Sequence, residues 1–431
     1  MSAPFVRAAP ADLPPALTPQ DFLTPDPAKA ELGRLLFYDK ILSGNRNISC
    51  GTCHHPRHGT SDGLSLGLGE GGHGLGLDRK SLLGKNRVQK RIPRNAPALW
   101  NVGAHDLKHV MHDGRISRDP IYGNGFNTPA EEWLPQGLGS LLAAQALFPM
   151  TSSIEMAGNV GENEIIGATR DRIDAAWPIL AKRVRVIPAY GNLFVAAFDE
   201  VEIASDVNIT HIANALAHFM AQDFTSFDSP FDAYLAGDRS ALTAAQIRGA
   251  TLFFGEAGCS GCHTGALFTD QRFHALGLPA FGPGRTRKFD PYARDVGRVG
   301  ESDALVDSYR FRTPMLRNVA LTAPFGHNGA FPTLDLMIRH HLDPVASRAA
   351  WSPRMLRLPD VPWLREIDFV IQQDRREMAR QAAARDIYLA PRTDAEVTDL
   401  VAFLHSLTGA KAKAQASEIP KTVPSGLAVD R

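Results

Sequence analysis

Two short stretches decide the fold of this chain of 431 residues: Cys50-Gly51-Thr52-Cys53-His54 and Cys259-Ser260-Gly261-Cys262-His263. Each is a C-x-x-C-H motif, the pattern through which c-type haem is attached. The two thiols form thioether bonds to the porphyrin, and the histidine becomes an axial ligand of the iron. One helical turn brings both sulfurs and the imidazole to the same face, which explains the spacing. The sequence therefore predicts two covalently bound haems.

A zinc site and a redox-active dithiol are the alternatives for these cysteines. A structural zinc site would combine both pairs into one set of four thiolates, but roughly 200 residues separate the pairs, where zinc ribbons use ~15–20. A redox dithiol does not need the histidine that follows each pair. The chain has four cysteines, so haem attachment would use all of them and leave none for a disulfide.

The composition excludes several functional classes. Lys plus Arg and Asp plus Glu both total 46, so the formal net charge is zero. This balance lacks the basic excess of a dedicated nucleic-acid binder, and no nucleic-acid partner is expected. The longest apolar runs, such as 193–198, are far shorter than the ~20 residues of a membrane span, so no span is expected.

The 37 glycines and 30 prolines indicate long irregular connections. We expect a mainly α fold of two cytochrome c-like haem domains with long irregular loops. Residues 1–27 are expected to form an extended lead-in, residues 28–207 the N-terminal domain, residues 208–410 the C-terminal domain and residues 411–431 a tail. No repeat is expected beyond the haem motif itself. Thr243-x-x-Gln246 and Thr393-x-x-Glu396 are capping boxes that predict the starts of two helices.

A series of ordered blocks accompanies the two motifs: Leu32-Gly-Arg-Leu-Leu-Phe37, Leu42-Ser43, Ser49-Cys50, Arg94-Asn-Ala-Pro97, His112-Asp-Gly-Arg115, Gln145-Ala-Leu-Phe-Pro149, Glu155-Met156, Ser229-Pro-Phe-Asp232, Thr313-Pro-Met-Leu-Arg-Asn318, Leu321-Thr-Ala-Pro324 and His327-x-Gly329. With these blocks the chain resembles the bacterial dihaem cytochrome c peroxidases and their MauG-type relatives, from about Leu32 to Leu407. The resemblance implies a peroxidase that takes hydrogen peroxide as a substrate.

The resemblance also implies roles for individual residues. His54 would be the proximal ligand of the peroxide-reacting N-terminal haem, and His263 that of the electron-transfer C-terminal haem. Glu155 matches the distal acid–base residue of the family, and Gln145 its distal glutamine. Cleavage of iron-bound peroxide needs a group that moves a proton between the two oxygens, and burial tunes the pKa of a carboxylate for that task. A salt-bridged surface position is the alternative for Glu155.

A calcium ion between the haems is implied as well. Asn101 and the backbone carbonyls of Thr322 and Pro324 line up with the calcium ligands of the family. Oxygen-only ligands suit a hard cation. The alternative is that these are plain loop residues.

Two positions depart from the peroxidases that need reductive activation. Those enzymes carry a blocking histidine four positions before the proline of the R-x-A-P block, where this chain has Pro93. We therefore expect a five-coordinate N-terminal haem that is open without prior reduction, as in MauG.

The second departure concerns the distal ligand of the C-terminal haem. Fourteen positions after His327, where the peroxidases have methionine and MauG has tyrosine, this chain has His341. We expect bis-histidine ligation by His263 and His341, with His340 or Met337 as the alternatives. Imidazole favours ferric iron more than thioether does and lowers the reduction potential.

Tryptophan is the residue type that relays electrons between the haems in the family. Trp133, in the long segment 116–138, is one candidate for this role, although its offset from Gln145 is unusual. Trp100, which lies nearby in the sequence, is the other candidate. The alternative for both is a structural role, because most tryptophans pack in the core.

These features favour a dihaem oxidoreductase that reacts with hydrogen peroxide, forms a high-valent haem pair and oxidises a tryptophan or tyrosine of a partner protein, as MauG does. The alternatives are a dihaem peroxidase that takes electrons from a small cytochrome c, and a dihaem electron-transfer cytochrome without catalysis. In bacteria c-type haem is attached outside the cytoplasm, so we expect a periplasmic protein whose signal peptide was removed or replaced.

Overall fold

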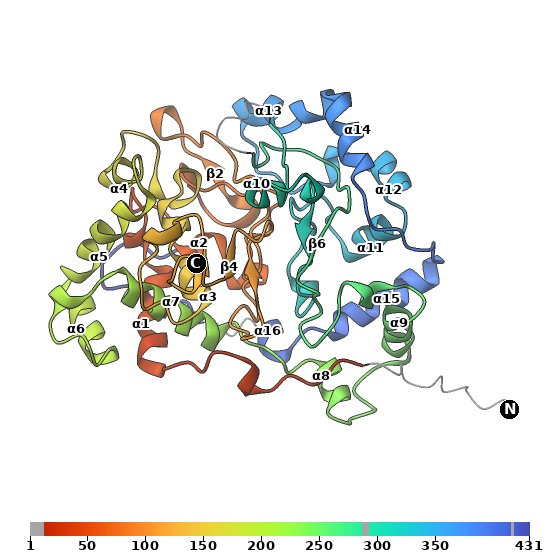
Figure 1. Cartoon of the computed structure of the whole chain (residues 1–431), viewed down its shortest axis with the longest axis horizontal. Coiled ribbons are helices and arrows are strands. Elements are labelled where there is room, and N and C mark those ends of the chain that lie inside the picture. The colour runs from red at the N-terminus through yellow and green to blue at the C-terminus, as the bar shows by residue number, and fades with distance from the viewer. Residues whose placement is uncertain (1–12, 287–292, 415–417) are drawn as a thin grey trace.

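The computed structural model describes residues 13–286, 293–414 and 418–431, and its fold is mainly α, as expected (Figure 1). The first twelve residues of the expected lead-in and residues 415–417 of the expected tail lie outside the described residues. The helices are α1 (Pro27–Tyr38), α2 (Cys50–Cys53), α3 (Leu141–Ala146), α4 (Glu164–Ala168), α5 (Trp177–Arg185), α6 (Pro188–Ala197), α7 (Ile209–Asp223), α8 (Pro230–Leu235), α9 (Ala244–Phe254), α10 (Val299–Ser302), α11 (Leu334–Leu342), α12 (Pro344–Ala350), α13 (Arg365–Phe369), α14 (Arg375–Ala383), α15 (Asp394–Ser406) and α16 (Ala410–Lys413).

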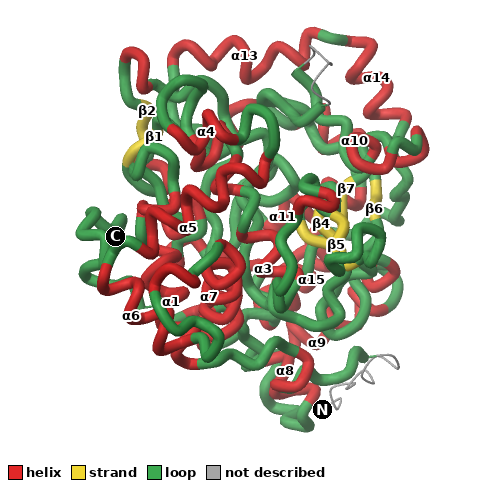
Figure 2. Tube along the Cα trace, turned by 60° about the vertical axis from the view of Figure 1, so that its left-hand side comes forward, coloured by secondary structure: helices red, strands yellow, loops and turns green. Residues whose placement is uncertain are grey.

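The strands are short and lie among the loops (Figure 2). They are β1 (Gly72–His73), β2 (Lys80–Ser81), β3 (His109–Val110), β4 (Ile116–Arg118), β5 (Phe126–Asn127), β6 (Phe273–His274) and β7 (Phe311–Arg312). They pair antiparallel as β1–β2, β3–β4–β5 and β6–β7. The loops between the helices are therefore braced by small local sheets.

The helix before the first haem motif crosses α7 at very close range. A Cβ on Gly33 of α1 would lie 1.9 Å from the carbonyl oxygen of Ala215 in α7. One turn further along each helix, the rings of Phe37 and Phe219 pack with centroids 5.0 Å apart at 55°. Only glycine allows backbones to approach this closely, so the crossing is fixed by residue size.

The helix before the second haem motif repeats this crossing. A Cβ on Gly249 of α9 would lie 1.9 Å from the carbonyl oxygen of Asp399 in α15. Phe253 and Phe403 then pack with centroids 5.0 Å apart at 55°. The expectation that nothing but the haem motif is repeated is therefore wrong. A glycine and a phenylalanine four residues apart are too weak a pattern to reveal a repeat in the sequence.

We expect Gly33→Ala to lower the free energy of unfolding by about 1–3 kcal/mol, because the added methyl group forces the two helices apart. The measurement is chemical denaturation of the holoprotein. Gly167→Ala in α4 is the control, since a Cβ there meets no atom within 4 Å and should be neutral or slightly stabilising. Equal losses for both variants would contradict the close crossing.

The buried apolar residues divide differently from the expected domains. One cluster runs from Leu32 to Phe224 and includes α7, and the next large cluster runs from Phe231 to Leu407. The expected boundary between residues 207 and 208 lies before α7, whereas α7 packs on α1 and belongs to the first cluster. The change from the first cluster to the second occurs in the segment after α7, between Phe224 and Phe231. The division into two haem domains itself stays a prediction.

The end of the described chain returns to the N-terminal part of the molecule (Figure 2). Ala412 of α16 joins the first core cluster. The Asp430 carboxylate accepts a hydrogen bond from the Thr52 hydroxyl at 2.7 Å and pairs with Lys40 at 2.7 Å. The segment expected as a tail is thus packed against the first haem motif.

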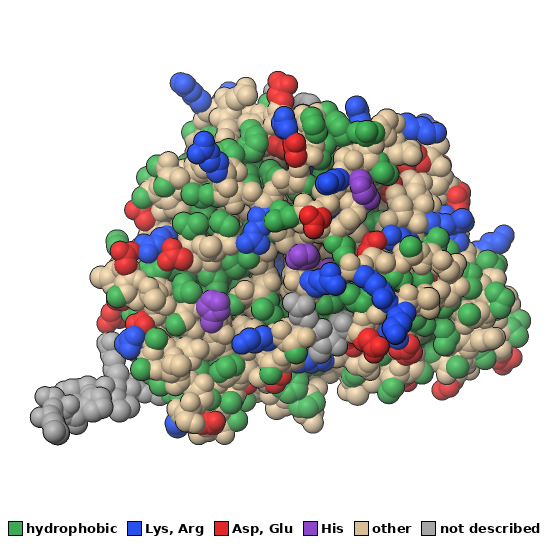
Figure 3. All heavy atoms as spheres, turned by 180° about the vertical axis from the view of Figure 1, so that it is seen from behind, with side chains coloured by type: hydrophobic (Ala, Val, Ile, Leu, Met, Phe, Trp, Pro, Cys, Tyr) green, Lys and Arg blue, Asp and Glu red, His purple; other side chains and the backbone are tan. Residues whose placement is uncertain are grey.

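Both predicted capping boxes are confirmed at the starts of α9 and α15. Among the described residues, no helix has both the length and the apolar character for crossing a bilayer. On the face opposite to that of Figure 1, acidic and basic side chains are intermixed (Figure 3). The balanced charge of the sequence is thus spread over this surface without segregation.

Candidate functional site

The two haem motifs open into one cavity of about 630 Å³. All four cysteines and the histidine that follows each pair lie on its wall. The rest of the lining comes from both halves of the chain and is largely apolar. An apolar hollow bordered by four thiols and two imidazoles has the chemistry that two porphyrins need.

The first motif folds as α2, with His54 at its C-terminal end. Nδ1 of His54 donates to the carbonyl oxygen of Thr60 at 3.0 Å, which leaves Nε2 for a metal. Burial lowers the pKa of His54, so the imidazole is neutral and able to ligate. A side chain at Gly51 would collide with the ring of Tyr38, so the motif sits directly on α1.

The second motif has the same arrangement around His263. Its first residues, Cys259–Gly261, form a 3₁₀ turn. Nδ1 of His263 donates to the carbonyl oxygen of Phe268 at 3.1 Å, and burial lowers the pKa of His263 to about 4. Backbone carbonyls thus orient both imidazoles, as is usual for metal-binding histidines.

The structure distinguishes between the two neighbouring histidines of α11. His341 lies on the cavity wall, with its ring centroid 6.5 Å from that of His263. Two metal–imidazole bonds of about 2 Å, plus the depth of each ring, require roughly this separation. Nδ1 of His341 donates to the carbonyl oxygen of Met337 at 2.8 Å, so Nε2 is again left for a metal.

His340 turns away from the cavity. Its two ring nitrogens lie within hydrogen-bond distance of the carbonyl oxygen of Leu276 (3.1 Å) and the hydroxyl of Ser347 (3.2 Å), and the side chain is fully buried. Met337 does line the cavity, one turn before His341. Of the three alternatives, the geometry favours His341 as the distal ligand.

Glu155 and Gln145 both line the cavity, and Glu155 is close enough to act on Cys53 of the first motif. Glu155 is carried by a π-helical turn, Ser153–Ala157, and Gln145 by α3. Burial raises the pKa of Glu155 above its ordinary value of 4.5, while the positive charges of Arg115 and Arg285 act against the rise. A buried carboxylate with a raised pKa is suited to accept and return a proton.

The Gly-rich segment 63–77 supports this turn. A Cβ on Gly69 would lie 2.0 Å from the carbonyl oxygen of Ile154 and 3.0 Å from Cα of Glu155. The next residue, Glu70, donates its N–H to the same carbonyl at 3.2 Å. The glycine content of the sequence indicated irregular connections in general, but not that a glycine is needed beside Glu155.

Pro93 lies on the cavity wall, in the segment between Ile92 and Arg94. Its side chain offers no metal ligand. The open coordination site of the first haem stays a prediction.

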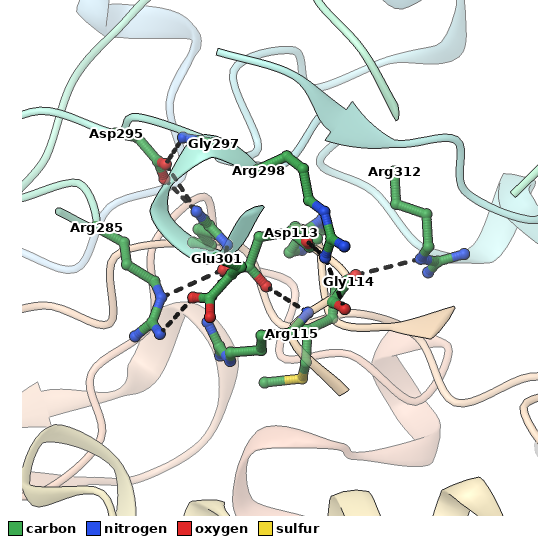
Figure 4. A network of polar contacts seen from close by, with 12 residues as sticks. Asp113, Gly114, Arg115, Arg285, Asp295, Gly297, Arg298, Glu301 and Arg312 are labelled. Atoms are coloured by element: carbon green, nitrogen blue, oxygen red, sulfur yellow. Dashed lines mark hydrogen bonds and ion pairs between the residues drawn. The ribbon is translucent and has the colours of Figure 1, made fainter. Parts of the chain in front are cut away.

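The structure also contains an arginine–carboxylate network that was not predicted (Figure 4). Two of its members, Arg115 and Arg285, are close enough to act on Glu155. The Asp113 carboxylate binds Arg94 at 2.6 Å, Arg115 at 3.0 Å and Arg285 at 3.2 Å. Burial alone would raise the pKa of Asp113, but the three arginines outweigh it and hold the pKa well below its usual range. The Arg94 guanidinium also donates two hydrogen bonds of 2.7 Å to the Asp295 carboxylate.

This network joins the two halves of the chain. Asp113 and Arg94 come from the N-terminal half, whereas Arg285, Asp295 and Glu301 come from the C-terminal half. Two members of the network, Asp113 and Arg115, belong to the block His112-Asp-Gly-Arg115 that the sequence analysis singled out. The sequence did not indicate which residues pair with them. Arg115 and Arg285, the two arginines that act on Glu155, are thus held in place by ion pairs with the buried carboxylate of Asp113.

The predicted calcium ligands are only partly brought together. Thr322 and Pro324 lie on the cavity wall, and no hydrogen bond among the described residues ends on their carbonyl oxygens. Asn101 is fully buried; its amide accepts from the N–H of Ser226 at 2.8 Å and donates to its carbonyl at 2.9 Å. The amide oxygen keeps one lone pair, so the set is compatible with a hard cation, and calcium stays a prediction.

Trp133 is not brought between the motifs. It is 48% exposed, with the guanidinium of Arg172 3.6 Å above its ring, and it does not line the cavity. Trp100 does line the cavity, is buried, and has an indole N–H without a partner among the described residues. The geometry therefore does not favour Trp133 as the inter-haem relay, because its side chain lies at the surface, and Trp100 is the better placed of the two.

A second group of potential metal ligands, Cys262, Asp270 and His274, gathers within 4.8 Å. Asp270 and His274 already pair with each other at 2.8 Å. Because the Cys262 thiol belongs to the haem motif, this group is part of the second haem site rather than a separate metal centre.

Comparisons with known proteins identify proteins that are similar to this chain. A family model described as di-haem cytochrome c peroxidase matches residues 27–240. The methylamine utilization protein MauG of Methylorubrum extorquens is 29% identical over 329 residues, which cover 76% of this chain and 72% of that protein. Cytochrome-c peroxidase IdrP1 of Denitromonas iodatirespirans is 31% identical over 349 residues, covering 76% of this chain and 75% of that protein.

Solved structures are similar over nearly the whole chain. The crystal structure of a MauG-like protein associated with microbial copper homeostasis has a TM-score of 0.61 and 25% identity, covering 97% of this chain and 99% of that one. The dihaem peroxidase BthA of Burkholderia thailandensis has a TM-score of 0.59 at 23% identity, covering 99% of this chain and 97% of that one. At 23% identity, the similarity to BthA shows a shared fold alone.

Proposed function

Because this chain belongs to the dihaem cytochrome c peroxidase and MauG family, and is therefore a peroxide-dependent dihaem oxidoreductase, we propose that it works in the MauG-like manner. In this proposal, its N-terminal haem site reacts with hydrogen peroxide without prior reduction. The oxidising equivalents then pass to a tryptophan or tyrosine side chain of a partner protein.

The position of Pro93 on the cavity wall carries this proposal. A histidine there could occupy the distal side of the first haem, and proline has no atom to do so. Peroxide can therefore reach the site in the resting, oxidised protein. A peroxidase that is fed electrons by a small cytochrome c would not need an open site in that state.

Glu155 and Gln145 supply the acid–base and hydrogen-bonding groups. When bound, the haem iron provides the centre at which peroxide is activated. The Glu155 carboxylate takes the proton of the incoming peroxide and returns it to the departing oxygen. The amide of Gln145, which lies 3.9 Å from the Met111 sulfur, can donate a hydrogen bond into the same space.

The second haem site stores oxidising equivalents in the proposal. Ligation by His263 and His341 favours the oxidised iron more than a histidine–methionine pair would. A calcium ion at Asn101, Thr322 and Pro324 would lie between the sites. The proposed location is the periplasm, since bacterial c-type haem is attached outside the cytoplasm.

Stoichiometric hydrogen peroxide added to the fully oxidised holoprotein should change the visible and near-infrared spectrum rapidly, without a reductant. A protein that stays inert until it is half-reduced, and that then oxidises a reduced small cytochrome c, would support the peroxidase alternative instead. Inertness in both states would leave only the electron-transfer cytochrome.

A further inference from the structure

Six arginines line the cavity, and five of them pair with carboxylates. The pairs are Arg94 with Asp113 and Asp295, Arg115 with Asp113, Arg285 with Asp113 and Glu301, Arg294 with Glu377, and Arg317 with Asp232. The sixth, Arg312 of β7, binds no carboxylate among the described residues. Figure 4 shows it apart from the acidic side chains that hold its neighbours.

Among the residues that the structure describes, the Arg312 side chain is bound by backbone carbonyls alone. Its Nε donates to the carbonyl oxygen of Met111 at 3.2 Å, and Nη1 points to that of Thr313 at 3.3 Å. Burial lowers the pKa of Arg312 to about 10. A guanidinium removed from water without a counter-charge is costly, so the site is built to receive an anion.

The position of Arg312 relates it to both haem motifs. Met111 contacts Gln145 on the side of the first haem. The carbonyl of Thr313 accepts from the Thr269 hydroxyl at 2.7 Å. The next residue, Asp270, donates its N–H to the carbonyl of Cys262 at 2.7 Å. Arg312 is therefore linked to the second motif through Thr313, Thr269 and Asp270. The backbone of Pro314, two residues further on, also forms a hydrogen bond with His263.

We propose that Arg312 binds a propionate carboxylate of the C-terminal haem and supplies the positive charge that tunes its reduction potential. This inference rests on the proposed function, in which the second motif carries a haem. A planar guanidinium with free N–H groups matches a carboxylate in shape and charge. Porphyrin propionates are the carboxylates that the cofactor of this family brings into the cavity.

The test is a spectroelectrochemical titration of the holoprotein. Arg312→Leu should make the low-spin haem harder to reduce, because the added electron loses a nearby positive charge. We expect a roughly tenfold smaller equilibrium constant for its reduction, which is about 59 mV for one electron. Arg312→Lys should restore most of the reduction potential, because lysine keeps the positive charge. The restoration should be incomplete, because lysine lacks the planar guanidinium group.

Arg348→Leu is the matched control. Arg348 also donates to a backbone carbonyl, that of Gly277 at 2.9 Å, and burial likewise lowers its pKa, but it does not line the cavity. Its loss should leave both haem potentials unchanged. If Arg312→Leu does not accumulate as a holoprotein, Arg312→Gln is measured in its place.

Unchanged potentials in a neutral Arg312 variant that carries two haems would overturn the inference, as would a shift confined to the high-spin haem. A wild-type protein whose pyridine haemochrome assay shows fewer than two haems would instead overturn the proposed function. The two failures are therefore separable.

Discussion

Glu155→Gln is expected to slow the reaction of the oxidised protein with hydrogen peroxide by about 10²–10⁴-fold. Glutamine has nearly the shape of glutamate but cannot take up the proton of the incoming peroxide. Stopped-flow spectroscopy measures the rate, and the absorption spectra of both haems should stay unchanged. Glu132→Gln is the control, because Glu132 is exposed and lies outside the cavity wall; an unchanged rate in Glu155→Gln would remove the assigned role.

The pH dependence gives a second readout of the same residue. Burial raises the pKa of Glu155, and only the ionised form can accept a proton. The wild-type rate should therefore fall as the pH drops through this raised pKa, which lies above the ordinary value of 4.5. The residual rate of Glu155→Gln should lack this step.

His341→Ala is expected to abolish the low-spin ferric signal in electron paramagnetic resonance and to leave two high-spin haems. The His341 imidazole faces His263 across 6.5 Å, so its removal takes one axial ligand from the second iron. His341→Met should restore a low-spin haem with a higher potential, because thioether favours ferrous iron more than imidazole does.

His340→Ala is the neighbouring control. It removes two contacts and so costs stability, on the order of 1–3 kcal/mol, but the low-spin signal should persist. His340→Asn keeps a hydrogen-bonding side chain in case the alanine variant does not fold. Loss of the low-spin signal in His340→Asn, with retention in His341→Ala, would falsify the ligand assignment.

The haem sites were largely predictable because their residues are neighbours in sequence. A Cys-x-x-Cys-His motif needs one helical turn, so spacing alone fixes its geometry. The same locality explains the capping boxes at Thr243 and Thr393, since both partners of each lie within three residues.

Features that depend on distant partners could not be predicted. Arg94 and Asp295 are 201 residues apart in the chain, and Arg285 and Asp113 are 172 apart. Trp133 shows another limit, because the resemblance suggested an inter-haem role for a tryptophan whose side chain lies at the surface.

His340 and His341 lie between the features that local sequence predicts and those that depend on distant partners. Consecutive residues of a helix point about 100° apart, so only one of them can face the cavity. Which one faces it depends on how α11 packs against the rest of the chain. A count of positions from His327 selected His341, and the hydrogen bonds of both imidazoles favour the same choice.

The twin crossings of Gly33 with Ala215 and Gly249 with Asp399 have a consequence for how such a molecule acquires two unlike centres. If both haems are supported by equivalent helix crossings, any difference in their function has to come from the few side chains that lie close to each haem. Exchanging those side chains, rather than rebuilding helices, is then the shortest route by which evolution or an engineer could turn one kind of centre into the other.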